Sequence, residues 1–225
     1  MFMRVISTGS TKGNCYALQS STGEIVLLDC GCKCKKILRG IGYQINNVSG
    51  VLLSHEHGDH TEAIHEIMNA GIAVYTGQET INNLGITDGT IKAVAEKKYF
   101  KIGSFSAVPF SLPHTSANKE HCRYKFKSME LNHLVIGCNY CEELIDRNNP
   151  KWKHQITGHC SLSTCKQFIK KNLTESLKTI TLVHLSGDAS DAEKMLKEVK
   201  EVVGDNVLVQ IGQAGLEVDL NLFPF

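Results

Sequence analysis

The sequence predicts a mixed α/β protein with sheets inside and helices outside, arranged as one domain over residues 1–225. Its 225 residues, 42% hydrophobic and 21% charged, are enough to bury a sizeable core. Short apolar runs alternate with polar and glycine-rich segments, without a long linker, an internal repeat or a block of like charges. The expected strands first form antiparallel hairpins and then alternate with helices, an order typical of layered α/β proteins.

The elements of the first half follow from apolar periodicity and turn residues. The continuous apolar run 51–53 indicates a buried strand, and apolar residues at 63, 64, 67 and 68 indicate a helix that ends near Gly71. The elements expected here are a strand over 4–8, a hairpin of strands over 15–19 and 24–29, a helix over 34–39, a strand over 48–54, a helix over 61–69 and a strand over 72–75.

The second half continues with strands and helices in alternation. Short β-like runs fill 91–113, with Gly103 as a turn, and Ser161 is expected to cap a helix that has Thr164 in its first turn. The remaining expected elements are a strand over 134–136, a helix over 161–171, a strand over 180–183, an amphipathic helix over 188–203 and a last strand over 207–211.

The charge balance excludes several descriptions of the whole chain. The 24 Lys and Arg against 23 Asp and Glu give a net charge of +1, which rules out a polybasic coat and an acidic tail but not a local basic patch. The amino terminus lacks the pattern of a signal peptide, and no stretch approaches the ~18 uninterrupted apolar residues of a membrane span. We therefore expect a cytoplasmic protein that does not cross a membrane.

The nine cysteines are odd in number and irregular in spacing. In a reducing compartment they are expected to be buried apolar thiols. Two groups leave a second metal site or a redox site open as alternatives, namely Cys30-Gly-Cys32-Lys-Cys34 and the pair Cys138 and Cys141.

The ten histidines point to a metal site, and the strongest motif is His55-Glu-His57-Gly-Asp59-His60. A buried strand delivers the chain to a tight turn from which four potential ligands emerge. His55 and His57 can reach one metal ion, whereas Asp59 and His60, beyond the bend at Gly58, can reach a second. Imidazole and carboxylate ligands suit zinc, manganese or iron.

A His-x-His-x-Asp-His motif after an apolar strand resembles the signature of the metallo-β-lactamase fold, a four-layer αββα sandwich. Residues 7–16 resemble the glycine- and serine-rich opening loop of that family, and 25–31 resemble its apolar strand followed by Asp-x-Gly. Gly158-His159-Cys-Ser and His184-Leu-Ser are similar to motifs of the small YycJ/WalJ-like and tRNase Z-like phosphodiesterase branch. The resemblance extends over nearly the whole chain.

The resemblance implies two zinc sites, with manganese as an alternative metal. It assigns His55, His57 and His114 to a firm site, and Asp59, His60 and His184 to a weaker one. The second site is expected to be weaker because the bridging aspartate of the family is missing: no aspartate lies between His114 and His133. Asn118 or Glu120 would stand nearest to its place.

The function implied is a metal-dependent hydrolase, most closely a phosphodiesterase or nuclease that uses a metal-bound hydroxide. Asp59 would orient the water or accept its proton, His159 would protonate the leaving oxygen, and Asp29 would orient a ligating histidine. The basic and aromatic run 123–127 suggests single-stranded nucleic acid, or else a small phosphodiester, as the partner.

Three alternatives stay open at this point. The chain could be a catalytically impaired member of the fold that binds a metal or a partner, or a hydrolase of another ester or thioester. A thiol-redox module built on Cys30, Cys32 and Cys34 is the third. The natural substrate, the metal identity and the oligomeric state do not follow from the sequence.

Overall fold

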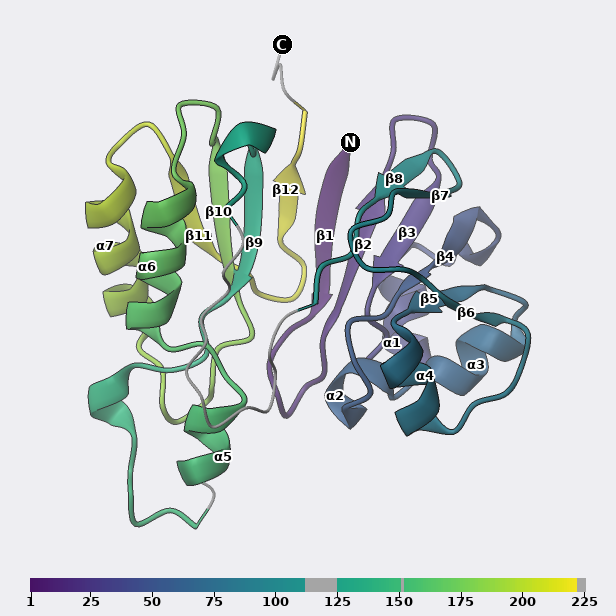
Figure 1. Ribbon diagram of the computed structural model, residues 1–225, viewed down its shortest axis with the longest axis horizontal. Helices are drawn as coiled ribbons and strands as arrows, with labels where there is room; N and C mark the ends of the chain where they lie inside the picture. The colour runs from purple at the N-terminus through teal and green to yellow at the C-terminus, as the bar shows by residue number, and fades with distance from the viewer. Residues whose placement is uncertain (112–124, 151, 222–225) are drawn as a thin grey trace. The chain divides into compact units, whose positions relative to one another are not determined.

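The structure is a computed structural model that describes residues 1–111, 125–150 and 152–221 (Figure 1). The chain separates into two compact units. Unit 1 contains Met1–Ser111 and Gln213–Phe225, and unit 2 contains Leu112–Gly212. Each unit has its own sheet, helices and hydrophobic core. The expectation of one domain over 1–225 stays a prediction.

Unit 1 is built on a seven-stranded sheet with the order β12-β1-β2-β3-β4-β5-β6. Its first strands form antiparallel hairpins, whereas β3 to β6 run parallel to one another. The strands of unit 1, including the separate hairpin β7-β8, are β1 (Phe2–Ser7), β2 (Cys15–Gln19), β3 (Ile25–Leu28), β4 (Val48–Leu52), β5 (Val74–Thr76), β6 (Ile91–Ala93), β7 (Phe100–Ile102), β8 (Phe105–Ala107) and β12 (Glu217–Asp219).

The helices of unit 1 pack on one face of this sheet and form its core. Leu27 and Val51 from the strands lie in one buried cluster with Ile37 and Ile67 from the helices. The carboxyl ends of β3 and β4 lie at the same edge of the sheet because these strands are parallel. The helices are α1 (Cys34–Gly40), the 3₁₀ turn η1 (Ile45–Asn47), α2 (Gly58–Thr61), α3 (Ile64–Asn69) and α4 (Gln78–Leu84).

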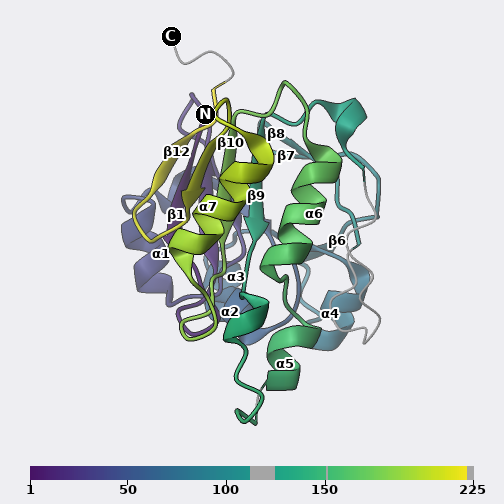
Figure 2. The same cartoon turned by 90° about the vertical axis from the view of Figure 1, so that its left-hand side faces the viewer.

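Unit 2 has a parallel three-stranded sheet with β10 in the middle. Ile180 and Leu182 of β10 pack into a core with residues of α6 and α7, which lie side by side in Figure 2 and are joined by a Lys166–Glu198 ion pair of 2.6 Å. The elements are η2 (Lys127–Met129), β9 (His133–Gly137), η3 (Glu142–Leu144), α5 (Trp152–Thr157), α6 (Leu162–Asn172), β10 (Thr179–Val183), α7 (Ala192–Val203) and β11 (Leu208–Ile211).

Most of the expected elements are present, and the helix expected over 61–69 shows the main difference. It is split into α2 and α3 because the Asp59 carbonyl, which a continuous helix would bond to the Ala63 N–H, accepts the Asn14 N–H instead, at 2.7 Å. The Ala63 N–H donates to the Cys30 carbonyl at 2.9 Å. Contacts with distant segments therefore replace one helical turn.

Other differences lie at weak sequence signals. The helix expected from 188 begins at Ala192, because Asp191 caps it by accepting the Lys194 N–H at 3.0 Å. Helices α4 and α5 and strand β12 were not expected from the sequence. No helix in the part of the chain that the structure describes is long and apolar enough to cross a membrane.

Candidate metal centre

The loop over residues 55–60, which we name the histidine loop, follows the carboxyl end of β4 in unit 1. Two neighbouring segments hold its backbone in place. The Asp59 carbonyl accepts the Asn14 N–H, and the His60 carbonyl accepts the Cys30 N–H at 2.9 Å. Gly31 lies so close that a Cβ there would be 1.7 Å from the Asp59 carbonyl oxygen. Only glycine permits this approach, so the backbone fixes the positions of Asp59 and His60 before any side chain contributes.

Asp29, directly after β3, supports two of the histidines. Its Oδ2 lies 2.7 Å from Nδ1 of His60 and accepts the Ser54 hydroxyl at 3.1 Å, while its Oδ1 accepts the Ser54 N–H at 2.7 Å. Because Ser54 donates to Asp29, its oxygen is free to accept from His55 Nδ1, which is 2.9 Å away. These contacts favour a proton on Nδ1 of both rings, so Nε2 is the ring atom that could hold a metal ion, the arrangement by which carboxylates orient ligating histidines.

Asp29 is held in an unusual backbone conformation. It is only 7% exposed and has a φ of +58°, in the left-handed region that residues other than glycine seldom adopt. Such conformations persist where the surrounding structure fixes them, and they cluster at functional sites. In this conformation, the one carboxylate of Asp29 contacts both Ser54 and His60.

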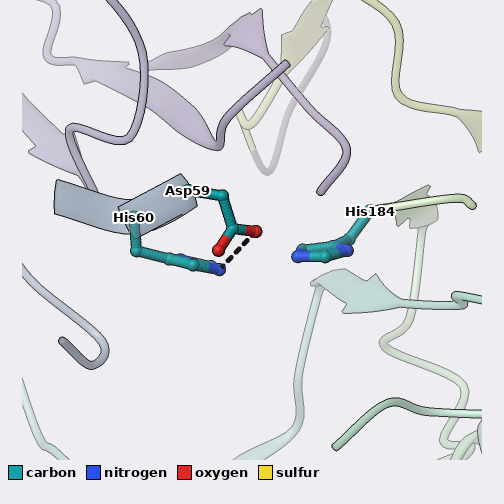
Figure 3. Close-up of side chains that lie close together, drawn as sticks. All are labelled: Asp59, His60 and His184. Atoms are coloured by element: carbon teal, nitrogen blue, oxygen red, sulfur yellow. Dashed lines mark ion pairs between the residues drawn. The ribbon is translucent and has the colours of Figure 1, made fainter. Parts of the chain in front are cut away.

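The rings of the histidine loop lie against one another. The His55 and His57 ring centroids are 4.7 Å apart, and those of His55 and His60 are 4.0 Å apart. Figure 3 draws the ion pair of 3.5 Å between Asp59 Oδ2 and His60 Nε2. Burial lowers the pKa of His60, but its hydrogen bond to Asp29 and the charges of Asp29 and Asp59 raise it by more, so the net shift is upward.

Asn14 is a residue of this site that the sequence reasoning missed. Asn14 is 1% exposed, and its side-chain amide donates to the Asp59 carboxylate at 3.1 Å and lies 3.3 Å from His60 Nε2. Its carbonyl oxygen accepts the Gly9 N–H at 3.0 Å. Asn14 thus fixes the orientation of Asp59 from within unit 1. Its place after Gly13 in the glycine- and serine-rich loop was the available signal.

In unit 2, His184 follows β10 and adopts a left-handed φ of +61°. The buried Asn139 holds it: the amide nitrogen lies 2.7 Å from His184 Nδ1 and donates to the His184 carbonyl at 2.9 Å. The amide oxygen of Asn139 accepts the Cys160 N–H at 2.8 Å. The ring of His159 lies 5.6 Å from that of His184, centroid to centroid. Asn139 therefore fixes the segments that carry both histidines, a role that sequence reasoning missed.

The amino terminus of α6 follows His159 and is already capped. Ser161 accepts the Thr164 N–H at 3.2 Å, which confirms the expected cap. The Glu142 carboxylate accepts the Ser163 N–H at 3.2 Å and also the Ser163 hydroxyl. A carboxylate at this end of the helix opposes the binding of a phosphate to the helix N–H groups.

Several expected site residues lie outside the described residues. These are His114, the two candidates for the bridging carboxylate, and the first part of the basic run: His114, Asn118, Glu120, Arg123 and Tyr124. Lys125 and Lys127, the described basic residues of that run, are exposed.

The described cysteines are mostly core residues. Cys15, Cys30, Cys32, Cys138, Cys141 and Cys165 are buried, in agreement with the expected packing role.

Comparisons with known proteins relate the chain to a family of known fold. Residues 8–115 match the family model of the Metallo-beta-lactamase superfamily. Exodeoxyribonuclease YycJ of Bacillus anthracis is 23% identical over 235 residues, with 88% of each protein covered. Anti-Pycsar protein Apyc1 of Bacillus phage 010DV004 is 21% identical over 175 residues, 67% of this chain and 66% of that protein. The crystal structure of human tRNase Z, short form, is similar with a TM-score of 0.66 at 14% identity, covering 98% of this chain and 100% of that one.

The family match and the curated relatives point to a metal-dependent hydrolase. Residues 8–115 of the chain match the metallo-β-lactamase superfamily, and the expected fold class is confirmed. The resemblance to the YycJ/WalJ-like and tRNase Z-like branch is confirmed by the same comparisons.

Proposed function

We propose that the chain is a nuclease, a metal-dependent phosphodiesterase that cleaves nucleic acid. The observation that carries the proposal is the histidine loop of unit 1, in which Asp29 orients His60 and, through Ser54, His55. The similarity to an exodeoxyribonuclease over 88% of both chains favours a phosphodiester over other esters. A small phosphodiester is the alternative substrate for the same chemistry.

The donor set fits a divalent metal. Imidazole nitrogens with one carboxylate suit zinc or manganese, and the hydrogen bonds of Asp29 leave Nε2 of His60 as its ligand atom. Under the proposal, His55, His57 and His114 hold one zinc firmly, and Asp59, His60 and His184 hold a second more weakly. A bound divalent ion supplies a Lewis acid that polarises phosphoryl oxygens and lowers the pKa of water.

The residues of the chain supply the proton chemistry. Asp59, held by Asn14, orients the attacking water and accepts its proton. His159 donates a proton to the leaving oxygen. A His159→Asn variant should therefore lose about 100-fold or more in rate on an oligonucleotide, whose leaving group is a poor one. The same variant should lose far less on bis-p-nitrophenyl phosphate, whose leaving group needs no acid. Equal losses on both substrates would remove His159 from this role.

The activity itself is tested by incubating the chain with zinc or manganese and labelled single-stranded DNA or RNA. Cleavage should disappear in His57→Ala and persist in His65→Ala, which removes an exposed histidine outside the loop. Absence of turnover with every divalent metal, together with intact metal binding, would favour a binding protein of this fold. The missing aspartate between His114 and His133 is the observation in favour of that alternative.

The two metal sites can be counted directly. Protein purified without added zinc should retain one equivalent, because a second ion without a bridging carboxylate has less compensation for the repulsion between two dications. Two equivalents of equal affinity would contradict this part of the proposal. A cytoplasmic location also belongs to the proposal, and cell fractionation tests it.

A further inference from the structure

A group of tyrosine and lysine side chains in unit 1, four of them exposed, lies outside the histidine loop. It consists of Tyr75, Lys92, Lys98, Tyr99 and Lys101, which we name the tyrosine–lysine patch. Lys92, Lys98, Tyr99 and Lys101 are exposed, and Tyr99 retains 58% of its surface. Residues 92–101 hold four lysines and one acidic residue, Glu96, which pairs with Lys97 at 3.4 Å. The segment is therefore locally basic in a chain that is close to neutral.

The hairpin β7-β8 has two distinct faces. Phe100 and Ile102 point to the inner face: Ile102 is 1% exposed and a Cβ at Gly50 would lie 2.6 Å from its Cδ1. Tyr99 and Lys101 alternate with them and point outward. The hairpin is thus anchored on the sheet by its apolar face, and its outer face is not needed for packing.

The aromatic rings of the patch are held in place. The hydroxyl of Tyr99 lies 2.9 Å from that of Ser106, across the hairpin, so the ring is fixed while its face stays accessible. Tyr75 packs against Phe100 with centroids 5.5 Å apart, and the Lys92 ammonium lies 5.5 Å from the centroid of Tyr75. Glu24 accepts the Ser104 N–H at 2.8 Å and ties the turn of the hairpin to the sheet. A fixed ring loses little conformational entropy when a ligand stacks on it.

The patch starts at the edge of the sheet from which the histidine loop emerges. Leu52, the last residue of β4, pairs with Tyr75, and Tyr75 pairs with Lys92, all in parallel strands. Adjacent strands are about 4.8 Å apart, so the Lys92 strand is roughly 10 Å from the strand that delivers His55. A flexible polyanion bound along the patch could therefore continue to the loop.

We infer that the tyrosine–lysine patch binds single-stranded nucleic acid, with a base stacked on Tyr99 and phosphates on Lys92, Lys98 and Lys101. Stacking on an aromatic side chain tolerates any base, and lysines beside it bind the backbone, which is the chemistry of unspecific single-strand binding. The inference rests on the proposed nuclease function and names the segment that would deliver the strand to it.

The test measures binding, not cleavage. The metal-loaded protein is titrated into fluorescein-labelled oligothymidylate and oligouridylate of about 20 nucleotides with phosphorothioate linkages, which resist hydrolysis, and anisotropy is read. Tyr99→Ala should weaken binding roughly 5- to 100-fold, and Tyr99→Phe should keep most of it because the ring remains. Tyr43→Ala is the matched control, since Tyr43 is 65% exposed and lies outside the patch. Melting temperatures confirm that each variant is folded.

The lysines are tested by salt dependence. A Lys98→Gln, Lys101→Gln double variant should reduce the slope of log K against log salt by about 0.7 for each lost phosphate contact. Lys170→Gln, Lys171→Gln removes the same charge from exposed positions on α6 and should leave the slope unchanged. Equal weakening by both double variants, or unchanged affinity in Tyr99→Ala, overturns the inference.

The outcome separates the inference from the proposed function. Cleavage that depends on His57, with unchanged binding in the patch variants, would refute the patch and leave the nuclease standing. Absence of cleavage, with binding lost in Tyr99→Ala, would support the patch and refute the nuclease. A higher affinity for the DNA or the RNA probe identifies the type of single strand that the patch prefers.

Discussion

The two units of the molecule hold their histidines in different ways. In unit 1, Nδ1 of His60 faces the buried carboxylate of Asp29 at 2.7 Å. In unit 2, Nδ1 of His184 faces the amide nitrogen of Asn139 at the same distance. A carboxylate accepts a hydrogen bond from Nδ1–H and leaves Nε2 as a basic nitrogen, whereas an amide N–H donates a hydrogen bond to Nδ1 and favours a proton on Nε2.

A histidine that follows a strand is therefore not by itself a metal ligand. The group behind the ring decides which nitrogen is available and how basic it is. Unit 1 combines the carboxylate of Asp29, its left-handed backbone conformation and a tightly packed backbone around Asp59. In unit 2, the group that faces Nδ1 of His184 is a neutral amide.

The largest effect is expected from disrupting the close packing of the backbone around Asp59 in unit 1. Gly31→Ala places a methyl group on the Asp59 carbonyl and should cost about 2–4 kcal/mol of unfolding free energy, with loss of metal binding. Gly58→Ala is the control in the same loop, because a Cβ there meets nothing within 4 Å. Chemical denaturation of both variants measures the difference. Similar unfolding free energies would show that this packing is not tight.

The charge difference is tested next. Asp29→Asn keeps the size of the side chain but removes the charge behind His60, and it should weaken metal binding about 10- to 100-fold. Asp205→Asn removes a charge from a side chain that is 98% exposed and should have no effect. Isothermal titration with zinc gives both affinities. An unchanged zinc affinity in Asp29→Asn would show that the charge of Asp29 does not strengthen metal binding.

A smaller effect is expected from removing the hydrogen bonds of Asn139 in unit 2. Asn139→Ala leaves the Cys160 N–H and the His184 carbonyl without their partner and should cost about 1–3 kcal/mol of stability. It should also lower kcat with little change in KM, because His159 and His184 lose their positions. Asn172→Ala removes another buried amide of unit 2 and should cost similar stability at unchanged kcat. Equal kcat values in the two variants would make Asn139 merely structural.

The smallest effect concerns the carboxylate at α6. Burial raises the pKa of Glu142, but hydrogen bonds from Ser161 and Ser163 lower it by more, so its folded value lies below 4.5. Its contribution to stability is complete above about pH 4.5 and is lost as the pH falls through the folded value. Glu142→Gln should lower the melting temperature by about 1–2 °C at pH 7 and flatten this acid dependence. A variant with the wild-type acid profile would exclude Glu142 as its source.

How much the sequence could predict depends on how local each feature is. The strand β4 and the histidine loop were predicted because both lie within residues 48–60, a continuous segment of clear pattern. The support of a histidine by Asp29 was expected only through the resemblance to a family. Asn14 and Asn139 were missed because their partners are 45 residues away in the chain. Strand β12 was missed because Glu217-Val-Asp219 has little apolar pattern. This strand forms through its antiparallel pairing with β1.

Zinc titration of the wild type and of His57→Ala, with His65→Ala as the folded control, shows whether the metal centre is built on the histidine loop of unit 1. The tightly bound equivalent of the wild type should disappear in His57→Ala and remain in His65→Ala. A tightly bound equivalent that survives in His57→Ala would mean that the metal ion is held elsewhere.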